Sequence, residues 1–296
     1  MAREECMLCP RGCGVDRRFE RGWCGAGPLP RVSLAAPHHD EEPVLSGTRG
    51  SGTVFFTGCA LRCRFCQNHR ISTAPDAGQA YDEARLAALF LRLQAQGVHN
   101  LNLVTAGHYR PAVLSALRAA RRGGLRLPVV WNTGGYECKE AVHALAEDIQ
   151  IHLADLKFRS QELSGALAGA PDYFSFAGAY LREACRVCGP PQMDAQGLLR
   201  RGVIVRLLVL PGQRQDAIAL LRWAAQALPK DGFLLSLMSQ YTPPAGLSLA
   251  APFNRRVSRF ELRRVQEEAL ALGFTQGWFQ SRESATEGYL PDFSLS

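Results

Sequence analysis

Three cysteines on one short segment are the residues of this sequence best suited to chemistry. Cys59, Cys63 and Cys66 are spaced Cys-x3-Cys-x2-Cys, directly after the apolar run Val54–Phe56. Thiolates this close in the chain can each bind one iron of a cubane iron–sulfur cluster. Because no fourth cysteine is nearby, one iron would stay open to an outside ligand, which indicates chemistry rather than electron transport alone. A zinc knuckle is the alternative, although structural zinc sites usually draw two ligands from each of two turns.

A second group of cysteines lies near the N-terminus. It consists of Cys6, Cys9, Cys13 and Cys24, with turn-rich flanks. Four thiolates can hold structural zinc or a closed auxiliary iron–sulfur cluster. The shortness of the segment favours zinc or a structural role, and a closed cluster that relays electrons is the competing interpretation. Cys138, Cys185 and Cys188 stand apart from both groups. Cys185 and Cys188 could be further ligands, a redox pair or inert buried thiols.

The cysteine segment carries a family resemblance. It resembles the cluster-binding loop of the radical S-adenosylmethionine (radical SAM) enzymes, and residues 50–68 are similar to the branch of pyruvate formate-lyase-activating-enzyme-like proteins. In this family S-adenosylmethionine binds the open iron, and one electron cleaves it to methionine and a 5′-deoxyadenosyl radical. The resemblance therefore implies a [4Fe–4S] cluster at Cys59, Cys63 and Cys66, and it extends from Cys6 to about Gln280.

The same resemblance implies where S-adenosylmethionine binds. The family's Gly-Gly-Glu-Pro motif is absent, and His108 with Tyr109 matches the Thr-Pro-Thr-His-Tyr version found in related members. His108 is thus expected at the S-adenosylmethionine site, with a hydrogen-bonded loop histidine as the alternative. The resemblance also places Asn132, Thr133, Asp155 and Lys157 beside the methionine carboxylate and the ribose; Asn132 stands where relatives carry an aspartate.

The residue types of this set suit the ligand independently of the family. Lys157 offers a cation for a carboxylate, and Asp155 offers acceptors for ribose hydroxyls. A local ion pair between the two is the alternative. Arg206 interrupts an apolar strand, where a lone charge is costly unless it is paired with a ligand carboxylate or with another strand. Gln240 and Tyr241 end the last expected strand and are candidates for an adenine or substrate pocket.

The elements that must position these residues alternate along the chain. The expected strands are Thr53–Thr57, Asn100–Thr105, Pro128–Asn132, Ile149–Asp155, Val203–Val209 and Phe233–Met238. The expected helices are Asp82–Gln96, Arg110–Arg122, Glu137–Glu147, Gln161–Ala168, Phe176–Arg186 and Asp216–Leu228. Strand–helix repeats predict a parallel sheet with right-handed crossovers. We therefore expect an α/β fold, a partial (β/α)6 TIM-like barrel with its functional loops at the strands' C-terminal ends.

Punctuating residues and composition divide the chain further. Asp82 and Asp216 are expected helix N-caps, and Gly97 and Gly123 expected helix ends. We expect a cysteine-rich metal-binding segment at residues 1–36, the radical SAM core at 37–280 and a C-terminal tail at 281–296.

Bulk composition limits the partners and the compartment. The 296 residues carry a net charge of +7, with 34 basic side chains scattered rather than striped, so we expect no nucleic-acid binding. A partly basic face would suit an acidic electron donor such as flavodoxin or a ferredoxin-type protein. There is no long apolar run and no signal-peptide core, and the ten cysteines suit a reducing compartment. We expect a cytoplasmic protein without a membrane span.

These features predict a radical SAM oxidoreductase that abstracts hydrogen, with the backbone glycine of a glycyl-radical enzyme as one substrate. Hydrogen abstraction from a small molecule or from a different peptide is one alternative. A non-catalytic iron–sulfur, S-adenosylmethionine-binding or electron-transfer protein is the other.

Overall fold

A computed structural model of the chain describes residues 5–244, 246 and 248–280. Its centre is a curved sheet whose strands follow the order β10-β9-β8-β6-β5-β4-β2-β1-β3. The strands from β2 to β10 along this path all run parallel, as expected for a partial barrel. Their bounds are Ser51–Phe56 (β2), Leu101–Val104 (β4), Val129–Thr133 (β5), Ile151–Asp155 (β6), Leu199–Leu208 (β8), Leu234–Met238 (β9) and Gly277–Phe279 (β10).

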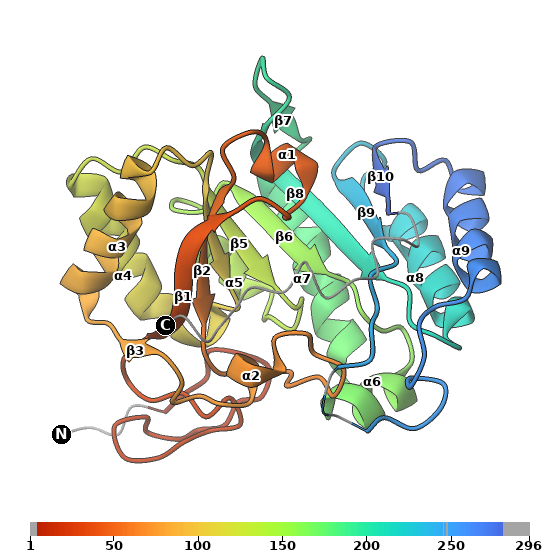
Figure 1. Cartoon of the computed structure of the whole chain (residues 1–296), viewed down its shortest axis with the longest axis horizontal. Helices are drawn as coiled ribbons and strands as arrows, with labels where there is room; N and C mark the ends of the chain where they lie inside the picture. The colour runs from red at the N-terminus through yellow and green to blue at the C-terminus, as the bar shows by residue number, and fades with distance from the viewer. Residues whose placement is uncertain (1–4, 245, 247, 281–296) are drawn as a thin grey trace.

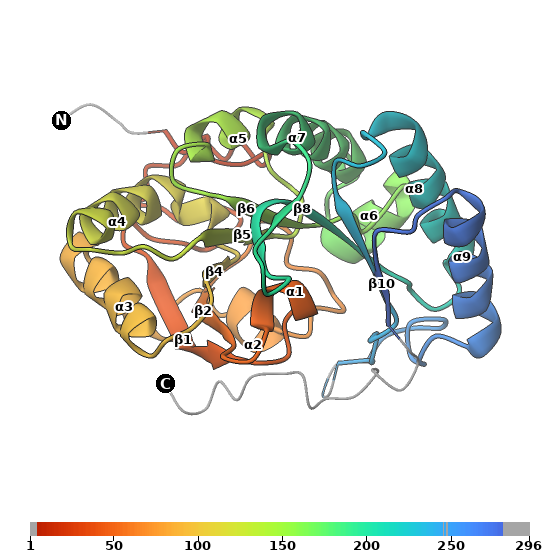
Figure 2. The ribbon, with the colours of Figure 1, turned by 90° about the horizontal axis from the view of Figure 1, so that it is seen from above.

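Helices cover the outer face of this sheet and leave its inner face to the site (Figure 1, Figure 2). They are α3 (Glu83–Ala95), α4 (Arg110–Arg122), α5 (Glu140–Leu145), α6 (Gln161–Ala168), α7 (Tyr173–Cys188), α8 (Arg214–Ala227) and α9 (Arg259–Ala271). Three short helical turns, α1 (Pro43–Ser46), α2 (His69–Ser72) and η1 (Gly107–Tyr109), lie in loops. The partial α/β barrel is thus confirmed.

Among the described residues, four strands, one long helix and the three short helical turns were not predicted. The strands β1 (Arg31–His38), β3 (Gln79–Ala80) and β7 (Gln192–Met193) pair antiparallel at the margins, and β10 adds a seventh parallel strand. The strands β3 and β7 are two residues long, too short for periodicity to reveal. The boundary expected between residues 36 and 37 falls inside β1, and the expected tail at 281–296 lies outside the described residues. The long helix that was not predicted is α9.

The expected helix starts at Asp216 and Glu137 were wrong, whereas the one at Asp82 was confirmed. Asp82 caps α3, since its Oδ1 accepts from the Arg85 N–H at 2.8 Å. Asp216, however, lies inside the first turn of α8 and accepts from the N–H groups of Arg159 and Ser160 at 2.9 and 2.7 Å. It thereby ties the loop after β6 to α8, a tertiary role that local sequence cannot show. Glu137 lies before α5, buried in the core side of the preceding turn.

The barrel interior explains where the site begins. Alternate strand residues face inward. The inner layer near the N-terminal ends of the strands is apolar. Leu45 of α1 packs there against Val130, Ile151, Leu153, Leu199, Ile204 and Leu234. The short α1 therefore closes the barrel at the strands' N-terminal ends. Two residues further along β5, β6 and β8 the same face carries Asn132, Asp155 and Arg206. Polar groups therefore begin one layer closer to the C-terminal ends of the strands than this apolar layer. Among the described residues no helix is long and apolar enough to cross a membrane.

Candidate functional site

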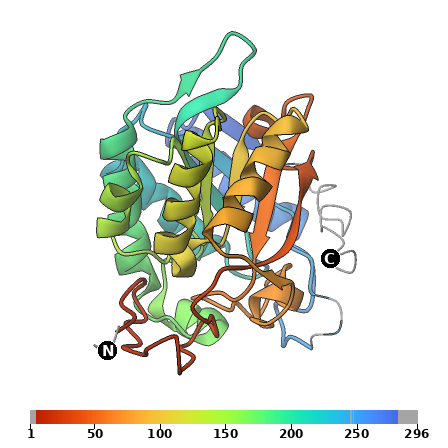
Figure 3. The same cartoon turned by 90° about the vertical axis from the view of Figure 1, so that its left-hand side faces the viewer.

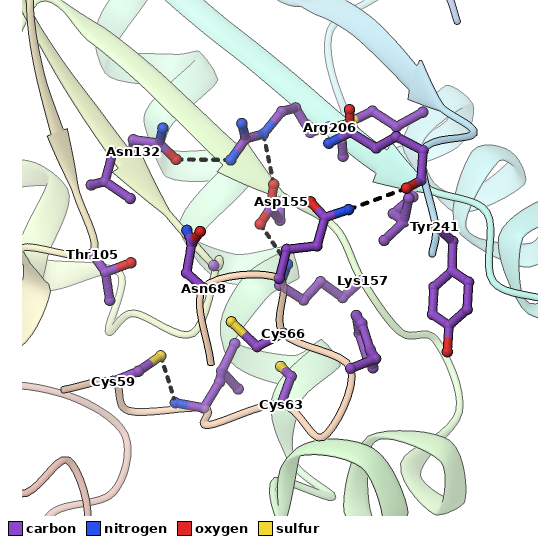
Figure 4. A pocket seen from close by; sticks show the side chains of 18 of the residues that line it. Cys59, Cys63, Cys66, Asn68, Thr105, Asn132, Asp155, Lys157, Arg206 and Tyr241 are labelled. Atoms are coloured by element: carbon purple, nitrogen blue, oxygen red, sulfur yellow. Dashed lines mark hydrogen bonds and ion pairs between the residues drawn. The ribbon is translucent and has the colours of Figure 1, made fainter. Parts of the chain in front are cut away.

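A cavity of about 230 Å³ opens at the C-terminal ends of the parallel strands. Cys59, Cys63 and Cys66 line one side of it, from the loop that follows β2 (Figure 4). Polar side chains of β5, β6 and β8 line the other side. Parallel strands all end at the same edge of the sheet, which is why residues far apart in the chain meet here.

The cysteine loop is shaped to present its sulfurs. Cys59 Sγ accepts from the Leu61 N–H at 3.4 Å, and Cys66 Sγ accepts from the Ser72 hydroxyl at 3.5 Å. Burial raises the pKa of Cys63, although the Lys157 ammonium acts to lower it. The Cys63 thiol is therefore protonated without metal, and metal binding must displace its proton.

This donor set fits a [4Fe–4S] cluster. Its three sulfurs line one cavity, a cation stands near, and no fourth cysteine lines the cavity, so a ligand can reach the remaining iron. Among the described residues, no three His, Cys, Asp or Glu side chains surround one point as ligands of a single ion do. A cubane does not require that arrangement, because each cysteine binds a different iron.

A buried charge network faces the loop. Arg206 Nε lies 2.7 Å from Asp155 Oδ1, and Arg206 Nη2 donates to Asn132 Oδ1 at 2.8 Å. Lys157 Nζ lies 2.5 Å from Asp155 Oδ2. The local ion pair expected as the alternative for Asp155 and Lys157 is therefore formed, and so is the pairing of Arg206 with another strand.

Each charge in this network is held by its neighbours. Burial by itself would raise the pKa of Asp155, but Arg206 and Lys157 outweigh burial and hold that pKa below its usual value. Burial acts to lower the pKa of Lys157, and Asp155 with Cys63 raises it instead. Asp155 is thus ionised and Lys157 protonated at neutral pH.

Glu41 completes the network, and sequence reasoning missed this residue. Its carboxylate lies 3.3 Å from Arg206 Nη1 and accepts from Asn102 and Asn132 at 3.0 and 3.1 Å. Glu41 follows β1 in the acidic run Asp40–Glu42. In the sequence this run resembles an ordinary exposed loop, and only the structure shows that it reaches the barrel interior. The neighbouring Glu42 accepts from Trp278, and burial with the Glu41 charge raises its pKa to about 7.

His108 and Thr133 do not line the main cavity. They line a smaller pocket with Cys9, Cys59 and Glu137. His108 Nε2 donates to the Thr57 carbonyl at 2.8 Å, and burial lowers the pKa of His108 to about 4. Thr133 Oγ1 donates to Glu137 Oε1 at 3.0 Å. The geometry of His108 is that of a hydrogen-bonded loop histidine.

Thr105 and Gln240 do line the main cavity. Thr105, at the end of β4, has a φ of 60°, an outlier for a β-branched residue. Such strain persists where surrounding structure enforces it, often at ligand sites. The Gln240 carbonyl accepts from Gln67, and its side-chain oxygen accepts from Gln280 at 3.2 Å.

The remaining cysteines separate into two groups, apart from the half-buried Cys138. Cys24 is buried, with its carbonyl against Gly58, whereas Cys6, Cys9 and Cys13 are half-buried nearby. Cys185 and Cys188 pack in the hydrophobic core at the end of α7, as inert thiols do.

Comparisons with known proteins agree with this site. Residues 46–165 match the family model described as a 4Fe-4S single cluster domain. An uncharacterized protein of Methanocaldococcus jannaschii is 28% identical over 275 residues, which cover 90% of this chain and 74% of that protein. The crystal structure of methylornithine synthase superposes with a TM-score of 0.51 at 15% identity, covering 74% of this chain and 62% of that one. A domain of pyruvate-formate lyase-activating enzyme from Bacteroides vulgatus gives a TM-score of 0.40 at 10% identity, covering 58% and 92%.

The fold and the site together define an α/β partial barrel with a cluster-binding loop at its mouth. Residues 46–165 match a 4Fe-4S single cluster domain, and the partial-barrel fold is shared with methylornithine synthase; both findings agree with the resemblance to the radical SAM enzymes that the sequence carries. The match to a 4Fe-4S single cluster domain supports a [4Fe–4S] cluster at Cys59, Cys63 and Cys66.

Proposed function

We propose that this protein cleaves S-adenosylmethionine reductively and abstracts a hydrogen atom from a substrate. When bound, the reduced cluster supplies the electron that cleaves S-adenosylmethionine to methionine and the 5′-deoxyadenosyl radical. The observation that carries the proposal is that the three loop thiols and a buried network of fixed charges face one cavity.

The network divides into ligand-contacting and positioning residues. The Lys157 ammonium has three donors and uses one on Asp155, which leaves two for the methionine carboxylate. Both ends of the Asn132 amide are already engaged, by Arg206 and by Glu41. Both oxygens of Asp155 are likewise engaged, by Arg206 and by Lys157. We therefore assign Lys157 to ligand contact, and Asp155, Arg206 and Asn132 to holding it in place. A cavity walled by the barrel also keeps water from the reaction.

We propose a glycine residue of a partner polypeptide as the substrate class. The sequence resemblance to activating enzymes supports this choice. Gln67 and Asn68 line the cavity immediately after Cys66, and amide side chains can both donate to and accept from a peptide backbone.

One assay tests the radical step. Anaerobically reconstituted protein, given dithionite and S-adenosylmethionine, should release 5′-deoxyadenosine, measured by mass spectrometry. Cys63→Ala should abolish release, whereas Cys188→Ala should retain it; the two cysteines are 8% and 6% exposed, so the controls match in burial. An intact cluster that binds S-adenosylmethionine and yields no 5′-deoxyadenosine would refute the enzymatic role in favour of a binding one.

A second assay tests the substrate class. With a glycyl-radical enzyme added, we expect a glycine-centred radical in the EPR spectrum and an equal amount of 5′-deoxyadenosine. Stimulation by small molecules alone, with no protein radical, would contradict the partner polypeptide and leave the radical step intact.

A further inference from the structure

The N-terminal cysteine segment is docked directly onto the cluster-binding loop (Figure 1, Figure 3). Gly58 immediately precedes Cys59, and a Cβ added to it would lie 2.6 Å from the Cys24 carbonyl oxygen. The two backbones are therefore in contact at this point. Cys9 and Cys59 also line the same small pocket. Two groups of thiols, separate in sequence, thus lie side by side in the fold.

Arginine side chains hold the segment in this position. Arg11 Nε donates to the Ala60 carbonyl at 2.8 Å, inside the cluster-binding loop. Arg62 from that loop donates back to the Trp23 carbonyl at 3.2 Å. Arg17 ties the segment to the turn η1 after β4, because it donates to the His108 carbonyl, and its Nη2 lies 3.7 Å from Cys24 Sγ. The docking is specific and reciprocal.

The N-terminal sulfurs share a local motif with the cluster-binding loop. Cys59 Sγ accepts from the backbone N–H two residues further on, that of Leu61. Burial raises the pKa of the Cys9 and Cys24 thiols, and the backbone N–H groups two residues further on, those of Arg11 and Ala26, act to lower it. Cys13 Sγ accepts from the Trp23 N–H at 3.4 Å. Hydrogen bonds to sulfur stabilise bound thiolates and tune the potential of iron–sulfur clusters.

The spacing favours a cluster over zinc. Cys6, Cys9 and Cys13 are close in the chain and Cys24 is remote, which is the three-plus-one pattern of cluster ligands. Structural zinc sites usually combine two close pairs. Four thiolates leave no iron open, so such a cluster would transfer electrons and bind no substrate.

We propose that Cys6, Cys9, Cys13 and Cys24 bind a second, closed [4Fe–4S] cluster that passes electrons to the cluster on the Cys59–Cys66 loop. A reduced flavin or iron–sulfur protein gives one electron to the N-terminal cluster, which passes it on; no bond forms or breaks. The relay role, unlike the cluster itself, rests on the proposed function.

Metal counting tests the cluster without any enzymatic readout. The reconstituted full-length chain should contain about eight iron and eight sulfide, and Cys9→Ala/Cys13→Ala about four of each. Cys59→Ala/Cys63→Ala should also keep about four iron, with an EPR signal that S-adenosylmethionine does not change. This reciprocal variant keeps the test valid if the first one folds poorly. About four iron with one zinc in the wild type, or about four iron and no zinc, would overturn the proposal.

The relay has its own readout. Cys9→Ala/Cys13→Ala should release 5′-deoxyadenosine with dithionite but fall to background with reduced flavodoxin, whereas Cys188→Ala should respond to both. Equal rates of the wild type and Cys9→Ala/Cys13→Ala with flavodoxin would refute the relay. A wild type that holds both clusters but never releases 5′-deoxyadenosine would instead refute the proposed function and leave the second cluster standing.

Discussion

The ion pair between Arg206 and Asp155 offers a matched comparison with a surface pair. Its Nε–Oδ1 distance is 2.7 Å, equal to the distance between Arg222 Nε and Glu268 Oε1. The side chains of the first pair are 15% and 12% exposed, whereas that of Arg222 is 61% exposed. The two pairs therefore share geometry and differ in burial.

Replacing Arg206 by leucine leaves buried carboxylates without their main cation. Breaking a buried pair by removing one partner costs about 3–5 kcal/mol, because the remaining charge is uncompensated. We expect the lower end, about 3 kcal/mol, since Lys157 still contacts Asp155 while Glu41 loses its cation. Arg222→Leu should change the stability little, because water and salt screen an exposed pair.

Anaerobic thermal unfolding of the reconstituted proteins measures the difference. A loss of 1 kcal/mol lowers the Tm of a large domain by about 2–4 °C, so Arg206→Leu should melt about 6–12 °C below the wild type. Arg222→Leu should stay within about 4 °C. Equal shifts in the two variants would show that burial does not amplify the pairing, and the assignment of Arg206 as the anchor of the site would fail.

Two further results follow from the packing and the titration of buried groups. Gly58→Ala should lower the iron content of the reconstituted chain, because its Cβ would lie 2.6 Å from the Cys24 carbonyl oxygen at a residue with a φ of 78°. In the control Gly165→Ala, in α6, the added Cβ meets nothing closer than 3.7 Å, so this variant should bind iron normally. Equal iron content in the two variants would contradict the close docking. Burial lowers the pKa of both His108 and His152 to about 4, so below about pH 6.5 the folded chain binds fewer protons than the unfolded chain. The Tm should therefore fall as the pH drops below about 6.5. A Tm that stays constant from about pH 7.5 to 5.5 would show that these histidines are not buried in the neutral form.

Local patterns in the sequence were enough for the frame of the fold. Strands β2, β4, β5, β6, β8 and β9 lie where continuous apolar runs predicted them, because most of their residues are buried, on one face under the helices and on the other inside the barrel. Helices α4 and α6 have the predicted bounds, since helical periodicity and capping residues act within a few positions. The strands β3 and β7 at the margins of the sheet were not predicted, because they are stabilised by pairing with β1 and β8 rather than by their own composition.

The sequence by itself also determined the cysteine loop, because three ligands of one cluster sit within a single turn-forming segment and need no distant partner to be recognised. Only the tertiary structure decided what faces that loop. Glu41 meets Arg206 across 165 positions of the chain, and Arg206 meets Asp155 across 51, through strand register and inward-facing alternation. Tertiary packing also decided that His108 donates to the Thr57 carbonyl and that the Cys24 carbonyl lies against Gly58. Such pairings depend on packing between elements, which local propensity does not encode.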